Sequence, residues 1–200
     1  MLTSNIKFKN YKIEKKEFKK NFFKEKWFKE IKLLDSLKDS YRYSYTKKNL
    51  KKYKKNINFK LIGMGGSTLG AEAIYQFLKF KVKKNFLFIN NLNPVIKKKK
   101  SFKNDINIII SKSGDTLETI LNSNLLISKN KNNIIITENR NSYLKKLAKD
   151  IRAEIFEHKN YIGGRYSVLS EVGMLPAEIM GLNEKKFKRF NHLINNNNFL

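Results

Sequence analysis

Short apolar runs alternate with helix-like segments from residue 56 onward, and this alternation constrains the fold more than any other feature. The runs with strand character are Phe59–Ile62, Phe86–Ile89, Ile106–Ile110, Ile134–Thr137 and, more weakly, Glu154–Phe156. The helix-like segments between and after them cover 67–80, 116–129, 141–150 and 168–181. Several runs are apolar on both faces, as strands buried inside a parallel sheet must be. The sequence therefore predicts an α/β fold with a doubly wound, five-stranded parallel sheet flanked by helices.

The rest of the chain suggests three parts: a helical segment over 1–56, an α/β domain over 57–183, and a polar linker or helix over 184–200. Apolar side chains recur along residues 12–35 at helical spacing, which predicts an amphipathic helix. They are Phe18, Phe22, Phe23, Trp27, Phe28, Ile31 and Leu34. We expect this stripe to pack against the neighbouring domain, although it also fits the groove of a partner. Residues 41–56 predict a second helix or a connector.

The chain has 200 residues, no cysteine and a formal net charge of +26. The absence of cysteine excludes disulfides and thiolate chemistry and is compatible with a cytoplasmic enzyme. No apolar run reaches the roughly 18 residues of a membrane span, and the first ten residues lack the pattern of a signal peptide. The positive charge could attract nucleic acid. Lysine and asparagine are abundant in every part of the chain, however, so we interpret the charge as a general compositional bias.

The first segment with chemical character is Gly63–Gly70, which follows the first strand-like run. Its glycines allow a tight turn from strand to helix, and Ser67 stands where the helix would begin. The spacing matches neither the G-x-G-x-x-G dinucleotide fingerprint nor a Walker loop. A purely structural turn stays open as an alternative.

The second segment, Ser111–Thr119, combines hydroxyls, a lysine and a glycine ahead of a helix. The N-terminus of a helix offers unpaired N–H groups and a positive dipole end to an anion. Hydroxyls and an ammonium group add charge-assisted hydrogen bonds. This pattern favours a phosphate cradle over an ordinary helix capped by Thr116.

The third segment, Gly163–Ser167, places Arg165 after two glycines. A permanently charged, planar guanidinium can stabilise an oxyanion that develops on a substrate. A surface salt bridge explains an arginine at this position equally well. Taken together, the three segments predict a site for a phosphorylated, polyhydroxylated ligand.

In this order, the three segments resemble the phosphoglucose isomerase family. That family has a G-x-G-G-S-x-L-G turn, an S-K-[ST]-x-x-T-x-E-T phosphate loop and a G-G-R-[FY]-S segment that leads into a helix. The resemblance runs from Leu61 to about Asn183 and includes Val168–Pro176. The first two motifs also occur in sugar isomerase (SIS) domains in general, whereas the third is more restricted to the family.

The resemblance implies an SIS-type sheet and an enzyme of glycolysis and gluconeogenesis. Such an enzyme interconverts glucose 6-phosphate and fructose 6-phosphate through an enediolate, as a homodimer with neither metal nor organic cofactor. It also implies three sets of site residues: Ser111, Lys112, Ser113 and Thr116 for the substrate phosphate, Gly66, Ser67 and Gly164 for the sugar, and Arg165 for the enediolate.

Two departures from the family pattern stand out. Asp115 occupies a position where the family has a neutral residue, and its carboxylate would repel a phosphate unless it points away or is paired. The family's glutamate base and ring-opening histidine have no counterpart here. We read His158 and His192 as surface or partly buried residues, and Glu171 as part of the last helix. We therefore expect this chain to be the N-terminal part of a longer protein.

Two other functions remain as alternatives to an isomerase. A stand-alone SIS module that senses a sugar phosphate would keep the second segment but would not need the third. A nucleic-acid-binding protein would interleave aromatic and basic residues on one face and would lose affinity steeply with salt. The aromatics of residues 18–31 instead share an apolar stripe.

Overall fold

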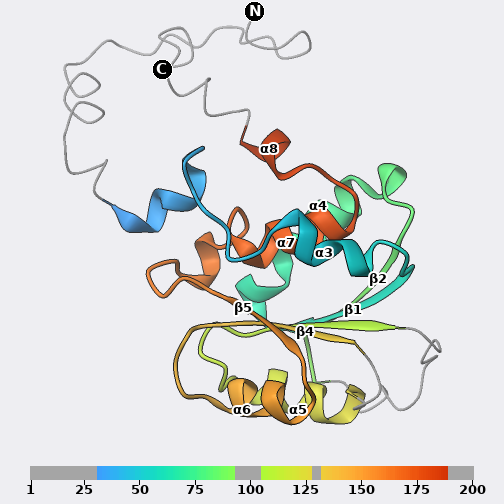
Figure 1. Ribbon diagram of the computed structural model, residues 1–200, viewed down its shortest axis with the longest axis vertical. Coiled ribbons are helices and arrows are strands. Elements are labelled where there is room, and N and C mark those ends of the chain that lie inside the picture. Colours follow the sequence, from blue (N-terminus) through green and yellow to red (C-terminus); the bar gives the residue numbers. More distant parts are fainter. Residues whose placement is uncertain (1–30, 93–104, 128–131, 189–200) are drawn as a thin grey trace, which may run out of the picture.

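A computed structural model describes residues 31–92, 105–127 and 132–188 (Figure 1). The strands are β1 (Asn58–Gly63), β2 (Asn85–Ile89), β3 (Ile106–Ile110), β4 (Asn133–Thr137) and β5 (Glu154–Glu157). The α-helices are α3 (Lys47–Leu50), α4 (Leu69–Phe77), α5 (Leu117–Leu126), α6 (Tyr143–Asp150), α7 (Glu171–Ile179) and α8 (Glu184–Phe187). Short 3-10 helices are η1 (Lys32–Leu37), η2 (Lys51–Tyr53), η3 (Gly65–Ser67), η4 (Lys79–Lys81) and η6 (Gly164–Tyr166).

The five strands form one parallel sheet in the order β2-β1-β3-β4-β5. This confirms the predicted doubly wound α/β fold. The chain leaves β1 toward one edge of the sheet and adds its later strands at the other, so the order reverses between β1 and β3. The last residues of these two strands, Gly63 and Ile110, are paired in register. Ligands of such sheets bind beyond the strand ends at this point of reversal.

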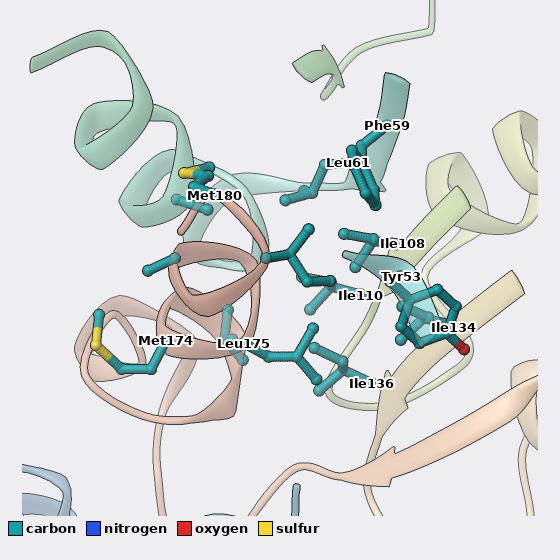
Figure 2. Close-up of a cluster of buried hydrophobic side chains, with 14 of the residues drawn as sticks. Tyr53, Phe59, Leu61, Ile108, Ile110, Ile134, Ile136, Met174, Leu175 and Met180 are labelled. Atoms are coloured by element: carbon teal, nitrogen blue, oxygen red, sulfur yellow. The ribbon is translucent and has the colours of Figure 1, made fainter. Parts of the chain in front are cut away.

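Helices cover both faces of the sheet (Figure 1). Alternate residues of a strand point to opposite faces, so Ile108 and Ile110 pack toward α7, while Ile109 packs toward α6. The central isoleucines of β3 and β4 are fully buried, which explains why both strands are apolar throughout. The larger cluster, shown in Figure 2, also contains Leu50 and Tyr53. The segment before β1 is therefore part of the same core.

The four helices predicted between and after the strands are confirmed, although their ends differ by a few residues. The segment 67–80 begins as the 3-10 turn η3 before α4, and the segment 168–181 becomes regular only at Glu171. Residues 41–56 contain two short helices, α3 and η2. The amphipathic helix predicted over 12–35 lies mostly outside the described residues, and its last part forms the 3-10 helix η1. Of the polar segment 184–200, the structure describes α8 and Lys188.

Candidate functional site

The loop between β3 and α5 gathers three hydroxyls at the carboxyl end of the sheet. Ser111 Oγ and Thr116 Oγ1 share a hydrogen bond of 2.9 Å, and Ser113 Oγ lies 3.5 Å from Thr116 Oγ1. The backbone N–H groups of Gly114 and Asp115 donate to Ser111 Oγ and Ser113 Oγ. These contacts hold the loop in a tight curve around its hydroxyls.

The N-terminus of α5 opens onto this loop without a side-chain cap. Thr116 is the residue before the helix, and its side chain accepts no hydrogen bond from the first turn. The interpretation of Thr116 as an ordinary helix cap is therefore wrong. The free N–H groups of the first turn and the positive end of the helix dipole remain available to an anion.

Gly114 adopts a backbone conformation that only glycine enters without strain, with φ of +73°. A Cβ atom at this position would lie 2.7 Å from Ser142 Cβ and 2.9 Å from Thr137 Oγ1. The backbone carbonyl of Gly114 also accepts a hydrogen bond of 3.0 Å from Leu144 N in α6. Glycine is thus required both by conformation and by the close approach of α6.

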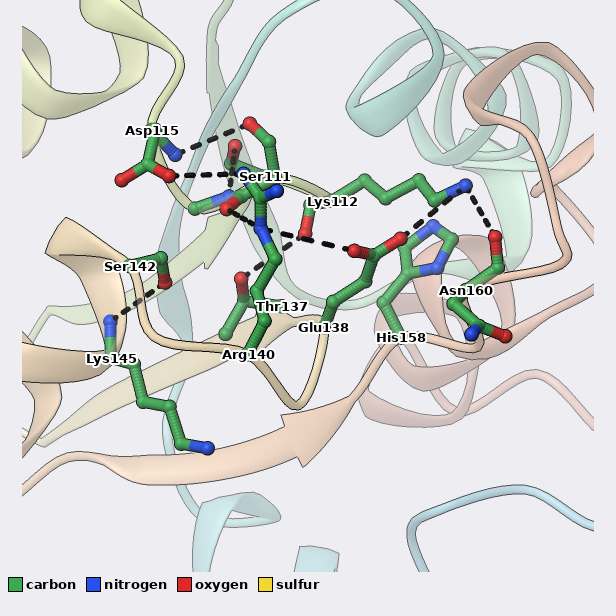
Figure 3. A network of polar contacts seen from close by, with 12 residues as sticks. Ser111, Lys112, Asp115, Thr137, Glu138, Arg140, Ser142, Lys145, His158 and Asn160 are labelled. Atoms are coloured by element: carbon green, nitrogen blue, oxygen red, sulfur yellow. Dashed lines mark hydrogen bonds and ion pairs between the residues drawn. The ribbon is translucent and has the colours of Figure 1, made fainter.

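Asp115 points away from the hydroxyls and is paired, as expected. Its carboxylate accepts a hydrogen bond of 3.0 Å from Arg140 Nη2 (Figure 3). It accepts a second, of 2.8 Å, from Tyr143 N. Arg140 Nε also donates to the carbonyl oxygen of Ser113 at 3.0 Å. We refer to Asp115 and Arg140 as the clasp, because together they fasten the loop to the start of α6.

Lys112 extends from the loop toward the chain that follows β5 (Figure 3). Its Nζ donates to the carbonyl oxygen of Asn160 at 2.6 Å and lies 3.4 Å from Glu138 Oε1. The ammonium group therefore neutralises a carboxylate and connects two loops. In this position it adds positive charge at the edge of the hydroxyl cluster. Direct contact with a phosphate would require Nζ to break its contacts with Asn160 and Glu138.

The first and third segments contact each other. A Cβ atom at Gly66 would collide with the carbonyl of Gly164 and would lie 3.0 Å from Arg165 N. Ser167 Oγ donates to the carbonyl oxygens of Gly164 at 2.7 Å and Gly66 at 3.3 Å. The predicted sugar-binding residues Gly66 and Gly164 are thus neighbours, although they are far apart in the sequence.

The first segment also adjoins the second. A Cβ atom at Gly63 would lie 2.6 Å from the carbonyl oxygen of Ile110 and 3.1 Å from Ser67 Cβ. Ser67 therefore lies beside the end of β3, and Ser111 is the residue that follows this strand. The first segment therefore contacts the third through Gly66 and Gly164, and through Gly63 it contacts Ile110, the residue before the second segment. Lys112 of the second segment bonds to Asn160, which lies three residues before the third.

Arg165 is exposed and follows Gly164 in the short helix η6. Within the described residues its guanidinium makes no ion pair, so the interpretation as a surface salt bridge finds no support there. The backbone of Arg165 lies beside Gly66, and its unpaired guanidinium is free to contact an anionic ligand.

Two acid–base candidates lie among the described residues, His158 and Glu171, and both are engaged in structural contacts. His158 is buried, with 1% of its surface exposed, so its assignment to the surface or partly buried class is wrong. Its ring Nδ1 lies 3.0 Å from the carbonyl oxygen of Lys159, and burial lowers its pKa. His192 lies outside the described residues. Glu171 lies in a helix, as predicted, and is the first residue of α7; it accepts hydrogen bonds from Tyr41 Oη and Ser44 N.

Sequence reasoning missed Glu138, Arg140 and Asn160. Glu138 and Arg140 lie within three residues of the end of β4, whose carboxyl end lies on the same edge of the sheet as the hydroxyl loop. That position was a usable signal, because polar residues beyond strand ends in such folds lie next to the ligand site. Asn160 acts through its backbone carbonyl, which no residue pattern reveals.

The described residues contain no group of three or more His, Asp or Glu side chains placed to hold a metal ion. Among the helices of the described ranges, none combines the length and apolar character that crossing a membrane requires.

Comparison with known proteins identifies similar sequences and folds. The family described as phosphoglucose isomerase matches residues 32–198. A glucose-6-phosphate isomerase of Methanocaldococcus jannaschii is 35% identical over 151 residues, which cover 69% of this chain and 37% of that protein. A glucose-6-phosphate isomerase of Borreliella afzelii is 38% identical over 147 residues, covering 64% of this chain and 27% of that protein. The chain therefore spans about a third of the length of these relatives.

Two solved structures share the fold. A hypothetical protein from Thermus thermophilus aligns with a TM-score of 0.60 at 23% identity, over 70% of this chain and 38% of that chain. The tagatose-6-phosphate ketose/aldose isomerase from Escherichia coli aligns with a TM-score of 0.56 at 16% identity, over 84% of this chain and 48% of that chain. At these identities the likeness concerns the fold alone.

Proposed function

The chain belongs to the phosphoglucose isomerase family, and we propose that it supplies the phosphate-binding half of an isomerase site. The reaction is the interconversion of glucose 6-phosphate and fructose 6-phosphate through an enediolate. The observation that carries this proposal is the meeting of three separate segments at one edge of the sheet, with Gly66 packed against Gly164. Because a Cβ atom at Gly66 would collide with the backbone carbonyl of Gly164, this contact requires glycine at position 66.

The substrate phosphate binds in the curve of the second segment. The hydroxyls of Ser111, Ser113 and Thr116 and the uncapped N–H groups of α5 donate to its oxygens. Lys112 adds positive charge from the side. Gly66, Ser67 and Gly164 line the sugar, and Arg165 stabilises the negative charge of the enediolate.

The general base comes from outside the described residues. The carboxylate of Glu171 is buried and hydrogen-bonded to Tyr41 and Ser44, and the ring of His158 is buried beside Lys159. Neither side chain is placed to move a proton between two carbon atoms of a substrate. We further propose that the complete enzyme is a homodimer and that residues 57–183 form its first sugar-phosphate domain. Its location in the cytoplasm stays a prediction.

The proposal that this chain is a half-site without its base can be tested by an activity assay. The assay measures turnover of fructose 6-phosphate by the purified chain, coupled to oxidation of glucose 6-phosphate. An Arg165→Ala sample prepared in the same way controls for contaminating host isomerase. We expect no turnover by the chain alone, together with binding of sugar phosphates. Turnover that disappears in Arg165→Ala would place the base within these residues and contradict the half-site. A chain that binds sugar phosphates but gains no turnover when the downstream part of the protein is added would favour a sugar-phosphate sensor instead.

A further inference from the structure

A cavity of about 330 Å³ lies between η1 with the residues that follow it and the chain between β5 and α7. Its lining residues are Asp35, Lys38, Ser40, Tyr41, Arg42, Lys159 and Tyr161. None of them belongs to the three segments of the candidate isomerase site. The volume falls at the lower end of the range that small-molecule sites occupy.

The charges around the cavity are predominantly positive. Three of the lining side chains are cationic and one is acidic. That acid, Asp35, is already paired with Lys38 at 2.6 Å. Lys159 Nζ lies 3.3 Å from Glu157 Oε2. This ion pair lies at the surface, so it contributes little to holding Lys159 in place. Once these two ion pairs are counted, Arg42 supplies the remaining positive charge of the lining.

Arg42 is the cation best placed to receive a ligand. It is exposed and has no ion-pair partner among the residues that the structure describes. Lys188 Nζ lies 5.3 Å from the ring centroid of Tyr41 and adds further positive charge near this wall of the cavity. A guanidinium with free N–H groups presents the fork geometry that matches the oxygens of a phosphate.

The neutral lining adds donors and aromatic surface. Ser40 and Tyr161 provide hydroxyl donors, and the rings of Tyr41 and Tyr161 provide flat apolar walls. The phenol oxygen of Tyr41 donates to Glu171 Oε2 at 2.8 Å, which fixes that ring in place. We propose that this cavity is a second anion-binding site, which takes a phosphate monoester that carries an aromatic group.

A titration of the ¹⁵N-labelled chain with phenyl phosphate, followed by amide chemical shifts, tests this proposal. We expect shifts at Ser40–Arg42 and at Tyr161, with several-fold tighter binding than inorganic phosphate gives at the same amides. Arg42→Gln should weaken binding there about tenfold, because it removes the charge that pairs with the phosphate. Arg152→Gln, at an exposed arginine outside the cavity, is the matched control and should leave the affinity unchanged.

Because chemical shifts are read at individual amides, they distinguish binding in the cavity from binding at the candidate isomerase site. Arg42→Gln should not alter the shifts that 6-phosphogluconate induces at Gly114, which also shows that the variant is folded. Tyr161→Phe, which removes one hydroxyl and keeps the ring, should weaken the binding of phenyl phosphate less than Arg42→Gln does. The proposal is wrong if millimolar phenyl phosphate leaves Ser40–Arg42 and Tyr161 unshifted, or if Arg42→Gln binds as tightly as the parent chain. Equal affinities for inorganic phosphate and phenyl phosphate would show that the cavity does not recognise the aromatic group of the ligand.

Discussion

At the scale of single residues, Gly114 determines the shape of the hydroxyl loop. Its φ of +73° and its contact with Ser142 leave no room for a side chain. We expect Gly114→Ala to lower the free energy of unfolding by about 1–3 kcal/mol, because it combines backbone strain with a steric collision. Chemical denaturation measures this loss.

Gly163→Ala is the matched control for that substitution. A Cβ atom at Gly163 would meet only Tyr166 Cδ2 at 3.5 Å, an ordinary contact, and the φ of this residue is −69°. Its stability should stay within about 0.5 kcal/mol of the parent chain. An equal loss in both variants would mean that the loop does not need a left-handed glycine.

At the scale of elements, the clasp joins the hydroxyl loop to α6. Both side chains are about half exposed, so their ion pair contributes at most about 1 kcal/mol to stability. Arg140→Ala should therefore leave the unfolding midpoint nearly unchanged. It should weaken the binding of 6-phosphogluconate several-fold, because Ser113 and Asp115 lose the contacts that hold them in place.

Lys149→Ala, which removes a cation from the exposed end of α6, controls for the loss of charge. Calorimetric titration of both variants measures the difference. If Lys149→Ala weakens binding as much as Arg140→Ala, the effect of Arg140 is one of net charge and the clasp has no positioning role.

The contact between α7 and α8 predicts a dependence of stability on pH. Burial, and then the hydrogen bond with Glu184, raise the pKa of Glu178 from 4.5 to about 7. Between these values the folded chain keeps a proton that the unfolded chain has lost, so stability falls as pH rises through this window. Glu178→Gln cannot ionise and keeps an acceptor for Glu184 N.

The stability of Glu178→Gln relative to the parent chain should therefore increase between pH 5 and pH 8, by roughly 1–3 kcal/mol, because a difference of one in pKa corresponds to about 1.4 kcal/mol. Thermal unfolding at both pH values measures this gain. Asp150→Asn, at the exposed end of α6, removes one carboxylate in the same way and should show no such trend. A constant difference between Glu178→Gln and the parent chain would contradict the raised pKa.

At the scale of the whole molecule, the sheet and the meeting of the three segments were predictable. Fully apolar runs such as Ile134–Ile136 admit few roles other than central strands, and parallel strands bring their carboxyl ends to one edge. Apart from the outward direction of Asp115, side-chain directions were not predictable. Lys112 turns toward Asn160 because that carbonyl and Glu138 are within reach, and neither neighbour is close to Lys112 in the sequence. The burial of His158 likewise depends on tertiary packing that no local pattern reports.

The most direct test of the three-segment site is a titration of the ¹⁵N-labelled chain with 6-phosphogluconate, read at its individual amides. We predict shifts both at Gly114–Thr116 and at Gly164–Ser167, because one ligand should contact both loops. The double variant Ser111→Ala/Thr116→Ala should weaken this binding at least tenfold, since it removes two hydroxyl donors from the phosphate. Shifts confined to other parts of the chain, or an affinity unchanged in the double variant, would contradict a sugar-phosphate site at this edge of the sheet.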